Sequence, residues 1–178
     1  MKFPKVEVTK TDAACRQLRE AIVLFFERRD LVAVHTLAAA SLQVLSDVGK
    51  AKGVTTGMLK HGRYIRDDKK KIWFELINEA QNFFKHADKD PDGVLDFKPS
   101  STPFYIIDAV LLEGQLRKEL SPASNCFLLW FYVAYPDVLT EEPFKAFSEA
   151  TLEAGIRAED FELFRDLISL SEKKAKHG

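Results

Sequence analysis

Apolar residues recur every three or four positions along most of this chain, which is the spacing that places them on one face of an α-helix. One such stripe follows Thr11 and Asp12, which can cap a helix that runs to about Arg29. Asp30 is placed to cap a second helix over 31–50, where an alanine-rich sequence favours helix formation and close packing. The two stripes are Leu18, Ala21, Ile22, Phe25 and Phe26, and then Leu31, Val34, Ala38, Leu42, Leu45 and Val48.

A third helix is predicted to begin at Asp67 or Asp68 and to end near Ala87. Its apolar stripe is broad, and we expect the centre of that stripe to face the core. Prolines then mark 88–103 as a loop, because proline breaks helical hydrogen bonding. The centre of the stripe is Ile72, Leu76, Ala80, Phe83 and Ala87, widened by Trp73, Ile77 and Phe84.

Proline and glycine also divide the second half of the chain into helices. Ser121 and Pro122 fit the N-cap and the first position of a helix that ends before Pro136. Thr140 can open the following helix and Gly155 can end it. The helices predicted here are about 104–120, 122–135, 140–154 and 159–173.

No segment shows the sustained alternation of apolar and polar residues that a strand requires. The chain of 178 residues is long enough to bury one full core. We therefore predict an all-α protein, a single-domain helical bundle of about six to seven helices over 1–178. The predicted interruptions are a glycine-rich loop at 49–66, the Pro/Asp-rich loop at 88–103 and a frayed tail at 174–178.

Net charge and cysteine usage limit the partners and the cellular compartment that the sequence favours. The formal net charge is -1, so no global field draws the chain to nucleic acid or to a membrane. Cys15 and Cys126 are far apart in sequence, which favours reduced thiols in a cytosol over a disulfide framework. The longest apolar run, 126–135, is about half of the roughly 20 residues that a membrane helix needs. We expect a cytoplasmic protein with no membrane partner.

The run HADKDPDGVLDF after the third predicted helix has the D-x-D-x-D-G spacing of a calcium loop. A calcium loop of the EF-hand type also needs a bidentate glutamate at its twelfth position, where this chain has Pro99. Pro91 moreover pushes Asp90 away from helical geometry. We interpret the run as a turn and predict neither a metal site nor a cofactor, with Asp88, Asp90 and Asp92 as the weak candidates for cation ligands.

A polar stripe lies beside the apolar one on the third predicted helix. Asn82 and His86 are four positions apart, so they share a face. Amides, carboxylates and an imidazole on one face can build a binding site, and they can equally form a solvated surface. The other members of the stripe are Glu75, Asn78 and Glu79.

The same helix carries a resemblance to a known family. The run QNFFKH, Gln81 to His86, resembles the HEPN signature, an arginine, a polar residue, three further residues and a histidine near the end of a helix. Asn82 and His86 match this signature, and Gln81 stands in place of the arginine. Glutamine cannot supply the positive charge that binds phosphate or stabilises a developing oxyanion. The longer run NFFKHADKDPD resembles a recurring signature of uncharacterised bacterial helical proteins.

The resemblance implies a helical bundle that forms a homodimer. In active HEPN ribonucleases the arginine and the histidine meet across the dimer interface and cleave RNA without metal. With Gln81 in the chain, we expect a binding or regulatory module with little or no catalysis, and a nucleotide, RNA or partner protein as its ligand near His86. The predicted ligand-binding residues are Gln81, Asn82, His86, Arg63 and Arg66.

Two other functions stay open from the sequence. The first is a metal-independent ribonuclease that uses His86 and Asn82, with an arginine such as Arg63 or Arg66 brought from elsewhere. These arginines lie in a basic segment, 60–71, that could also contact a nucleic-acid backbone or be a solvated loop. The second is a small-molecule or cation-binding helical protein. Whether the chain is an enzyme is therefore undecided at this point.

Overall fold

The computed structural model describes residues 4–54, 59–60, 65–88, 90–136, 138, 151 and 153–177. These residues form α-helices and short 3₁₀-helices with no strand among them, so the predicted all-α class is confirmed. The helix predicted over 140–154 lies almost entirely outside the described residues. The helices are α1 (Lys10–Phe26), α2 (Leu31–Ala51), η1 (Asp67–Lys69), α3 (Lys70–Lys85), η2 (Pro99–Ser101), α4 (Thr102–Arg117), α5 (Pro122–Ala134) and α7 (Phe161–His177).

Two predicted helix starts are confirmed by their capping hydrogen bonds. The side chain of Asp30 accepts hydrogen bonds from the backbone N–H groups of Val32 and Ala33, at 2.9 and 3.2 Å. The hydroxyl of Ser121 accepts from the backbone N–H of Ser124 at 3.2 Å, and Pro122 occupies the first turn of α5. Each cap satisfies an N–H group that has no partner inside its helix.

The start and the end of α1 differ from the predicted positions. Thr9, rather than Thr11 or Asp12, caps the helix by accepting from the backbone N–H of Asp12 at 3.1 Å. The Thr9 hydroxyl also donates to the Asp12 carboxylate, which lowers the pKa of that carboxyl. At the other end, Arg28 adopts left-handed backbone with φ 54°, which ends α1 at Phe26 instead of near 29.

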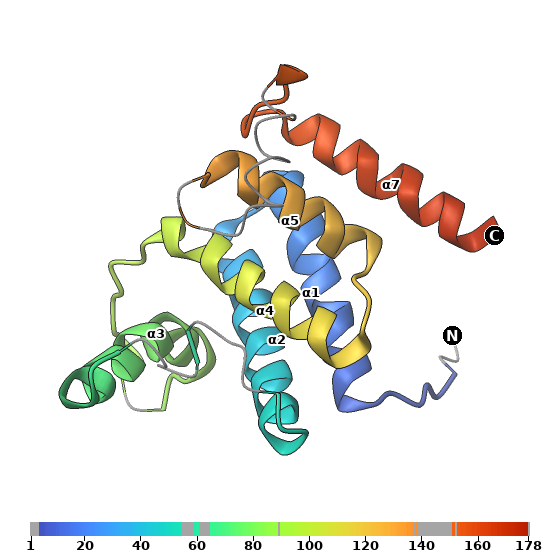
Figure 1. The fold of residues 1–178 in the computed structure, drawn as a ribbon. Coiled ribbons are helices and arrows are strands. Elements are labelled where there is room, and N and C mark those ends of the chain that lie inside the picture. Colours follow the sequence, from blue (N-terminus) through green and yellow to red (C-terminus); the bar gives the residue numbers. More distant parts are fainter. Residues whose placement is uncertain are drawn as a thin grey trace.

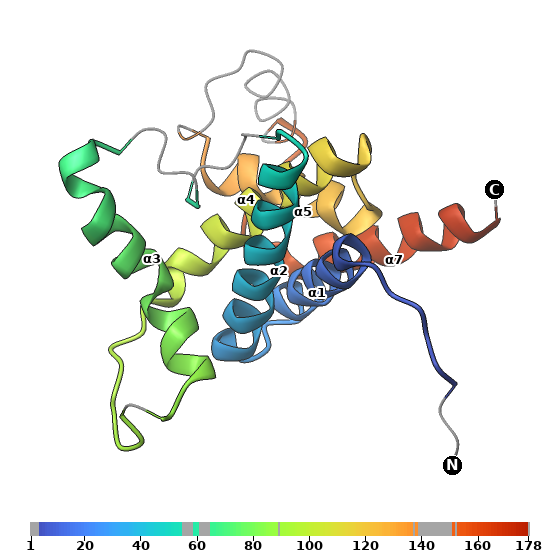
Figure 2. The ribbon, with the colours of Figure 1, turned by 90° about the horizontal axis from the view of Figure 1, so that it is seen from below.

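An aromatic cluster joins α1, α5 and α7 in the core. The ring of Phe25 on α1 meets Phe127 and Trp130 on α5 edge to face, with centroids 5.5 and 4.8 Å apart. Phe26 stacks on Phe164 of α7 at 5.4 Å. Figures 1 and 2 show α7 running along the outside of this group, with its C-terminal end extending beyond the bundle. Burial of these rings stabilises the bundle, because each removes a large apolar area from water.

Helix α2 lies against α1 and α4 and buries an apolar face between them. The hydroxyl of Ser41 on α2 donates to the backbone oxygen of Ala14 on α1 at 2.8 Å, which fixes their close approach. By length and composition, α2 is the one helix among the described residues that is long and apolar enough to cross a membrane. Core helices pass the same test, so this is weak evidence for a membrane span.

Both cysteines are buried free thiols. The thiol of Cys126 on α5 donates to the backbone oxygen of Phe164 on α7 at 3.1 Å. Burial raises the pKa of Cys126 to about 12. Burial, together with the charge of Glu113, raises the pKa of Cys15 to about 11. Neither thiol is therefore an activated nucleophile, because the thiolate is the reactive form.

Helix α3 stands to one side of the bundle, where it packs on α2 (Figures 1 and 2). The sequence predicted the wrong buried face for α3. The observed buried face is turned about the helix axis relative to the predicted one. Ile72 and Leu76, predicted at the centre of the buried stripe, are 52% and 62% exposed. Ile77 and the polar Gln81 are buried instead. The uncovered part of the stripe leaves large apolar side chains on the surface.

Candidate functional site

The inner face of α3 holds Gln81, which the sequence predicted as a ligand-binding residue. The amine of Lys60 donates to the side-chain oxygen of Gln81 at 3.3 Å and also to that of Asn78. Lys60 is 6% exposed, and burial lowers its pKa to about 8. Gln81 is therefore engaged in attaching α3 to the bundle.

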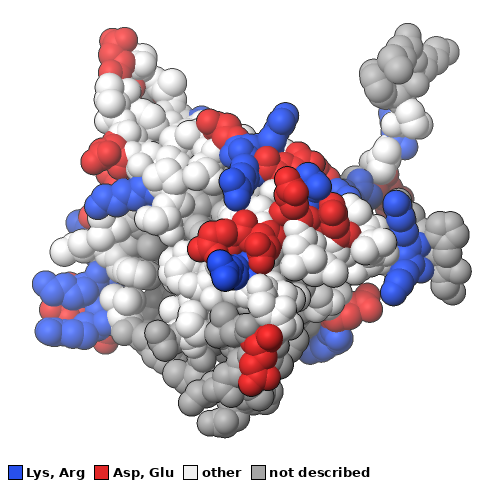
Figure 3. Space-filling view, turned by 90° about the horizontal axis from the view of Figure 1, so that it is seen from above, with Lys and Arg blue, Asp and Glu red and all other residues white. Residues whose placement is uncertain are grey.

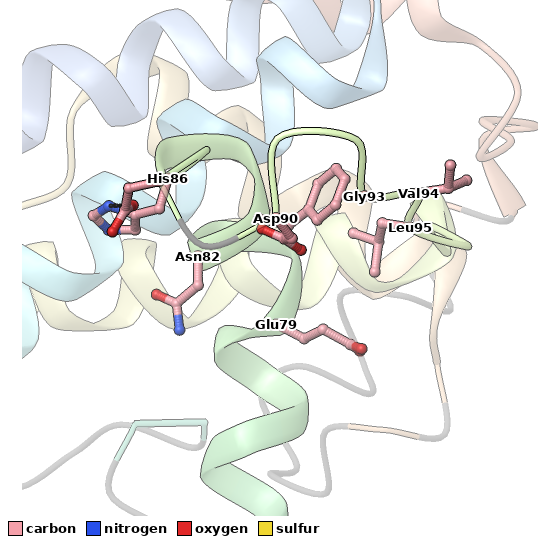
Figure 4. Close-up of a pocket in the computed structure, with 9 residues that line it drawn as sticks. Glu79, Asn82, His86, Asp90, Gly93, Val94 and Leu95 are labelled. Atoms are coloured by element: carbon pink, nitrogen blue, oxygen red, sulfur yellow. Dashed lines mark ion pairs between the residues drawn. The ribbon is translucent and has the colours of Figure 1, made fainter.

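The outer face of α3 carries the other predicted site residues, Asn82 and His86. Both are exposed, and together with the following loop they border a hollow with a volume of about 720 Å³ (Figure 4). In Figure 4 His86 and Asn82 lie at one end of the hollow, with Val94 and Leu95 at the other. The lining residues are Glu79, Asn82, Phe83, His86, Asp88, Asp90, Gly93, Val94 and Leu95. The structure thus brings Asn82 and His86 together and leaves Gln81 on a different face.

The aspartate-rich loop forms the turn that its sequence predicted. The backbone N–H of Gly93 donates to the backbone oxygen of Asp90 at 2.9 Å. A side chain at position 93 would meet the Asp90 carboxylate at 2.7 Å, so only glycine fits without rearrangement. Within the ranges that the structure describes, no group of three or more His, Cys, Asp or Glu side chains is placed to hold a metal ion.

Acidic groups dominate the border of the hollow. Of the described residues that line it, Glu79, Asp88 and Asp90 carry carboxylates and His86 carries an imidazole. The nearest approach of His86 to a carboxylate is 4.0 Å, from its Nδ1 to Oδ1 of Asp88, with both side chains largely exposed. Such a border repels phosphate groups and attracts cationic ones.

An apolar stripe leads along α3 into the hollow. Ile72, Leu76 and Phe83 lie on the same side of the helix as Glu79, at spacings of three, four and seven positions that keep them on one face. At the far side of the hollow Val94 is 95% exposed. Exposed apolar side chains grouped beside charged ones are typical of an interaction surface.

The predicted arginines do not join this group. Arg66 precedes η1, and its guanidinium pairs with both carboxylate oxygens of Asp68 at 3.1 Å. Arg66 and His86 lie beyond opposite ends of α3, whose 16 residues at 1.5 Å each span about 24 Å. Arg63 lies outside the described residues. A catalytic pair of Arg66 and His86 would therefore need the arginine of a second copy of the chain.

The described part of the predicted basic segment is balanced by acidic neighbours. Arg66 pairs with Asp68, and the amine of Lys70 lies 2.6 Å from Oδ1 of Asp67. Figure 3 shows a similar mixture on another face of the molecule, where Lys and Arg lie beside Asp and Glu. Neither region offers the uniform positive surface that nonspecific binding to a nucleic-acid backbone requires.

No protein-family model matches the chain, and no curated protein or solved structure matches it. The resemblance to HEPN proteins stays a prediction.

Proposed function

We propose that this protein is a non-catalytic binding module that holds a basic, amphipathic helical segment of a partner protein. The segment lies on the outer face of α3 and reaches into the hollow beside His86. The observation that carries this proposal is the exposed apolar stripe of α3, Ile72 and Leu76, leading into a hollow with an acidic border. An amphipathic helix that lays its apolar side in a groove is a recurrent mode of peptide recognition.

Charge favours a protein ligand over the RNA or nucleotide that the sequence left open. A phosphate in the hollow would meet Glu79, Asp88 and Asp90, whereas a lysine or arginine of a partner would be attracted by them. Ribonuclease chemistry also lacks support, because Gln81 replaces the arginine and accepts from Lys60. Asn82 and His86 then serve as hydrogen-bonding groups at the edge of the bound segment.

The same charges disfavour α3 of a second copy as the occupant. Two α3 helices paired antiparallel bring the same flank of each helix together. This places Glu75 and Glu79 against the same carboxylates of the other copy, and like charges at an interface are costly. The predicted homodimer, if it forms, uses another surface under this proposal, and both the dimer and the cytoplasmic location stay predictions.

The test uses fluorescence anisotropy with a labelled peptide of leucine and lysine, about four helical turns long. Its counterpart with glutamate in place of lysine is the matched probe. We expect micromolar binding of the basic peptide, which weakens with added salt, and at least about tenfold weaker binding of the acidic one, a difference of about 1.4 kcal/mol.

Two variants locate the binding. Ile72→Glu should weaken the basic peptide about tenfold or more, because it places a charge in the apolar stripe. Leu170→Glu is the control, since Leu170 is a similarly exposed apolar residue, 57% accessible, on α7. Equal weakening by both variants, or equal binding of both peptides, would overturn the proposal. RNA that the wild type cleaves and His86→Ala does not would also overturn it, in favour of the ribonuclease. RNA that the wild type binds without cleavage, and that His86→Ala does not bind, would overturn it in favour of an RNA-binding module.

A further inference from the structure

A second cavity lies between α3 and the bundle, on the inner side of the helix whose outer side carries the proposed docking surface. Its volume is about 410 Å³. Cavities of about 300–1,000 Å³ are typical of small-molecule sites. Five of its lining side chains are rings, from α2, α3, α4 and the loop before α4, and they are His35, Trp73, Phe97, Phe104 and Tyr105.

The polar atoms of two of these rings are already occupied. The hydroxyl of Tyr105 donates to the backbone oxygen of Ile77 at 2.5 Å. The indole N–H of Trp73 donates to the backbone oxygen of Leu59 at 2.9 Å. The first bond joins α4 to α3, and the second ties Trp73 of α3 to the segment that contains Leu59. What Trp73 and Tyr105 offer to a ligand is therefore the apolar surface of their rings.

His35 supplies one unsatisfied polar atom beside this apolar lining. It is 1% exposed, and its ring lies 4.5 Å from that of Tyr105 and 5.1 Å from that of Phe97, centroid to centroid. Its Nδ1 is 3.1 Å from the hydroxyl oxygen of Thr102, while Nε2 is buried behind the cavity wall and has no hydrogen-bond partner among the described residues. A buried polar atom without a partner is costly, and a ligand group that bonded to it would remove that cost.

The imidazole is neutral at neutral pH. Burial, and secondarily the charge of Lys60, lower the pKa of His35 to about 4. The charged residues that border the cavity are of both signs, and they are Glu79, Asp96 and Lys98. A neutral imidazole and an aromatic lining favour an uncharged ligand, because burying an unpaired charge is expensive.

We propose that this cavity binds a small, uncharged, planar aromatic molecule, with one hydroxyl or ring N–H that reaches Nε2 of His35 when the side chains packed around that atom move aside. Ring faces and edges of the lining contact the ligand in offset or edge-to-face geometry. The site goes beyond the docking surface, although Leu76 and Glu79 border the cavity and belong to the outer stripe as well. The two sites make separate predictions.

The experiment uses two matched probes, 2-naphthol and 2-methylnaphthalene, with binding measured by ligand-observed nuclear magnetic resonance titration of the full chain. We expect 2-naphthol to bind with a Kd below about 1 mM. The methyl compound should bind about tenfold more weakly, because it cannot bond to Nε2 of His35.

A cavity-filling variant locates the probe. Ala80 lines the cavity, and Ala80→Leu should weaken 2-naphthol at least about tenfold. Ala33→Leu, at an exposed position of α2, is the control and should leave binding unchanged. If Ala80→Leu fails to fold by circular dichroism, Ser101→Leu fills the same cavity from η2, at a residue that does not line the outer hollow.

Three results would overturn the inference or part of it. If 2-naphthol does not bind, the proposed site is contradicted. If Ala80→Leu and Ser101→Leu both leave binding of 2-naphthol unchanged, the probe binds elsewhere on the protein. If the two probes bind with equal affinity, the proposed hydrogen bond to His35 is contradicted. Loss of peptide binding in the earlier experiment affects none of these outcomes, so the two proposals fail separately.

Discussion

The bundle of α1, α2, α4, α5 and α7 and the single helix α3 are held by different kinds of contact. In the bundle, large side chains such as Phe127, Phe131 and Phe164 are fully buried. Helix α3 buries much less, and hydrogen bonds from Tyr105 and Lys60 contribute to its attachment. Apolar burial supplies most folding free energy, whereas a single hydrogen bond adds about 1 kcal/mol net.

Weak attachment makes α3 the element of this fold that is best suited to binding. Elements with little apolar burial open at lower free energy than the core, and binding segments are commonly drawn from them. Both proposed binding surfaces lie on α3, one on its outer side and one on its inner side. Four substitutions test this difference, beginning with the one expected to destabilise the fold most.

Phe127→Ala should cost about 3–5 kcal/mol of the free energy of unfolding, because it leaves a cavity among fully packed rings. Phe127 is completely buried and contacts the rings of Phe25, Trp130 and Phe131. Urea denaturation followed by far-ultraviolet circular dichroism measures the loss. Leu170→Ala, at an exposed site, should cost less than about 1 kcal/mol. Similar losses in both variants would contradict an apolar origin for the stability of the bundle.

Lys60→Met should change how stability depends on pH. The folded pKa of Lys60 is about 8, below its ordinary value of 10.5, so between these values the unfolded chain binds more protons. Wild-type stability should therefore rise between pH 8 and 10.5, by on the order of 2–3 kcal/mol from this group, and the variant should lack that rise.

The measurement is urea denaturation across this pH range. The quantity to compare is the difference in the free energy of unfolding between variant and wild type. Lys50→Met, at an exposed lysine of α2, is the matched control and should keep the wild-type slope. Parallel pH profiles for wild type and Lys60→Met would mean that the amine is not buried as described.

Tyr105→Phe removes the hydroxyl that donates to Ile77 on α3 and should cost about 1 kcal/mol. The loss should be local. Hydrogen exchange should accelerate in the amides of α3 more than in those of α1, because the bond attaches α3 to α4. Tyr135→Phe, at the end of α5, is the control. Uniform acceleration throughout the chain would show that α3 does not open separately from the bundle.

His86→Ala should change the free energy of unfolding by less than about 0.5 kcal/mol, because exposed ion pairs contribute little. The imidazole is 63% exposed and 4.0 Å from the Asp88 carboxylate. Chemical denaturation beside the wild type checks this. An unperturbed fold makes the variant a clean probe of binding, whereas a loss above about 1 kcal/mol would show a structural role for His86.

Local signals in the sequence were sufficient for the helices and insufficient for the orientation of α3. Asp30 and Ser121 cap where predicted, since a cap depends on its own and the next three residues. The buried side of α3 depends on partners far away in sequence. Gln81 is buried because Lys60, 21 positions earlier, reaches it, and no periodicity records that bond.

The features of the candidate site likewise fall into those that short-range spacing predicts and those that it does not. The turn at Asp90 and Gly93, and the shared face of Asn82 and His86, follow from short-range spacing. The inner cavity does not, because its wall combines His35, Trp73 and Tyr105 from three helices. A broad apolar stripe on α3 was the one available signal, since it exceeded what a single buried face requires.

The buried Cys126 thiol, which donates to Phe164, makes the rate of its alkylation a measure of how often the core opens. A buried thiol with a pKa of about 12 reacts with alkylating reagents only when the surrounding helices separate. The chain has two cysteines, and the other, Cys15, is buried on α1. The rate at which the native protein takes up label at Cys126 therefore reports how often α5 and α7 part, without any engineered probe.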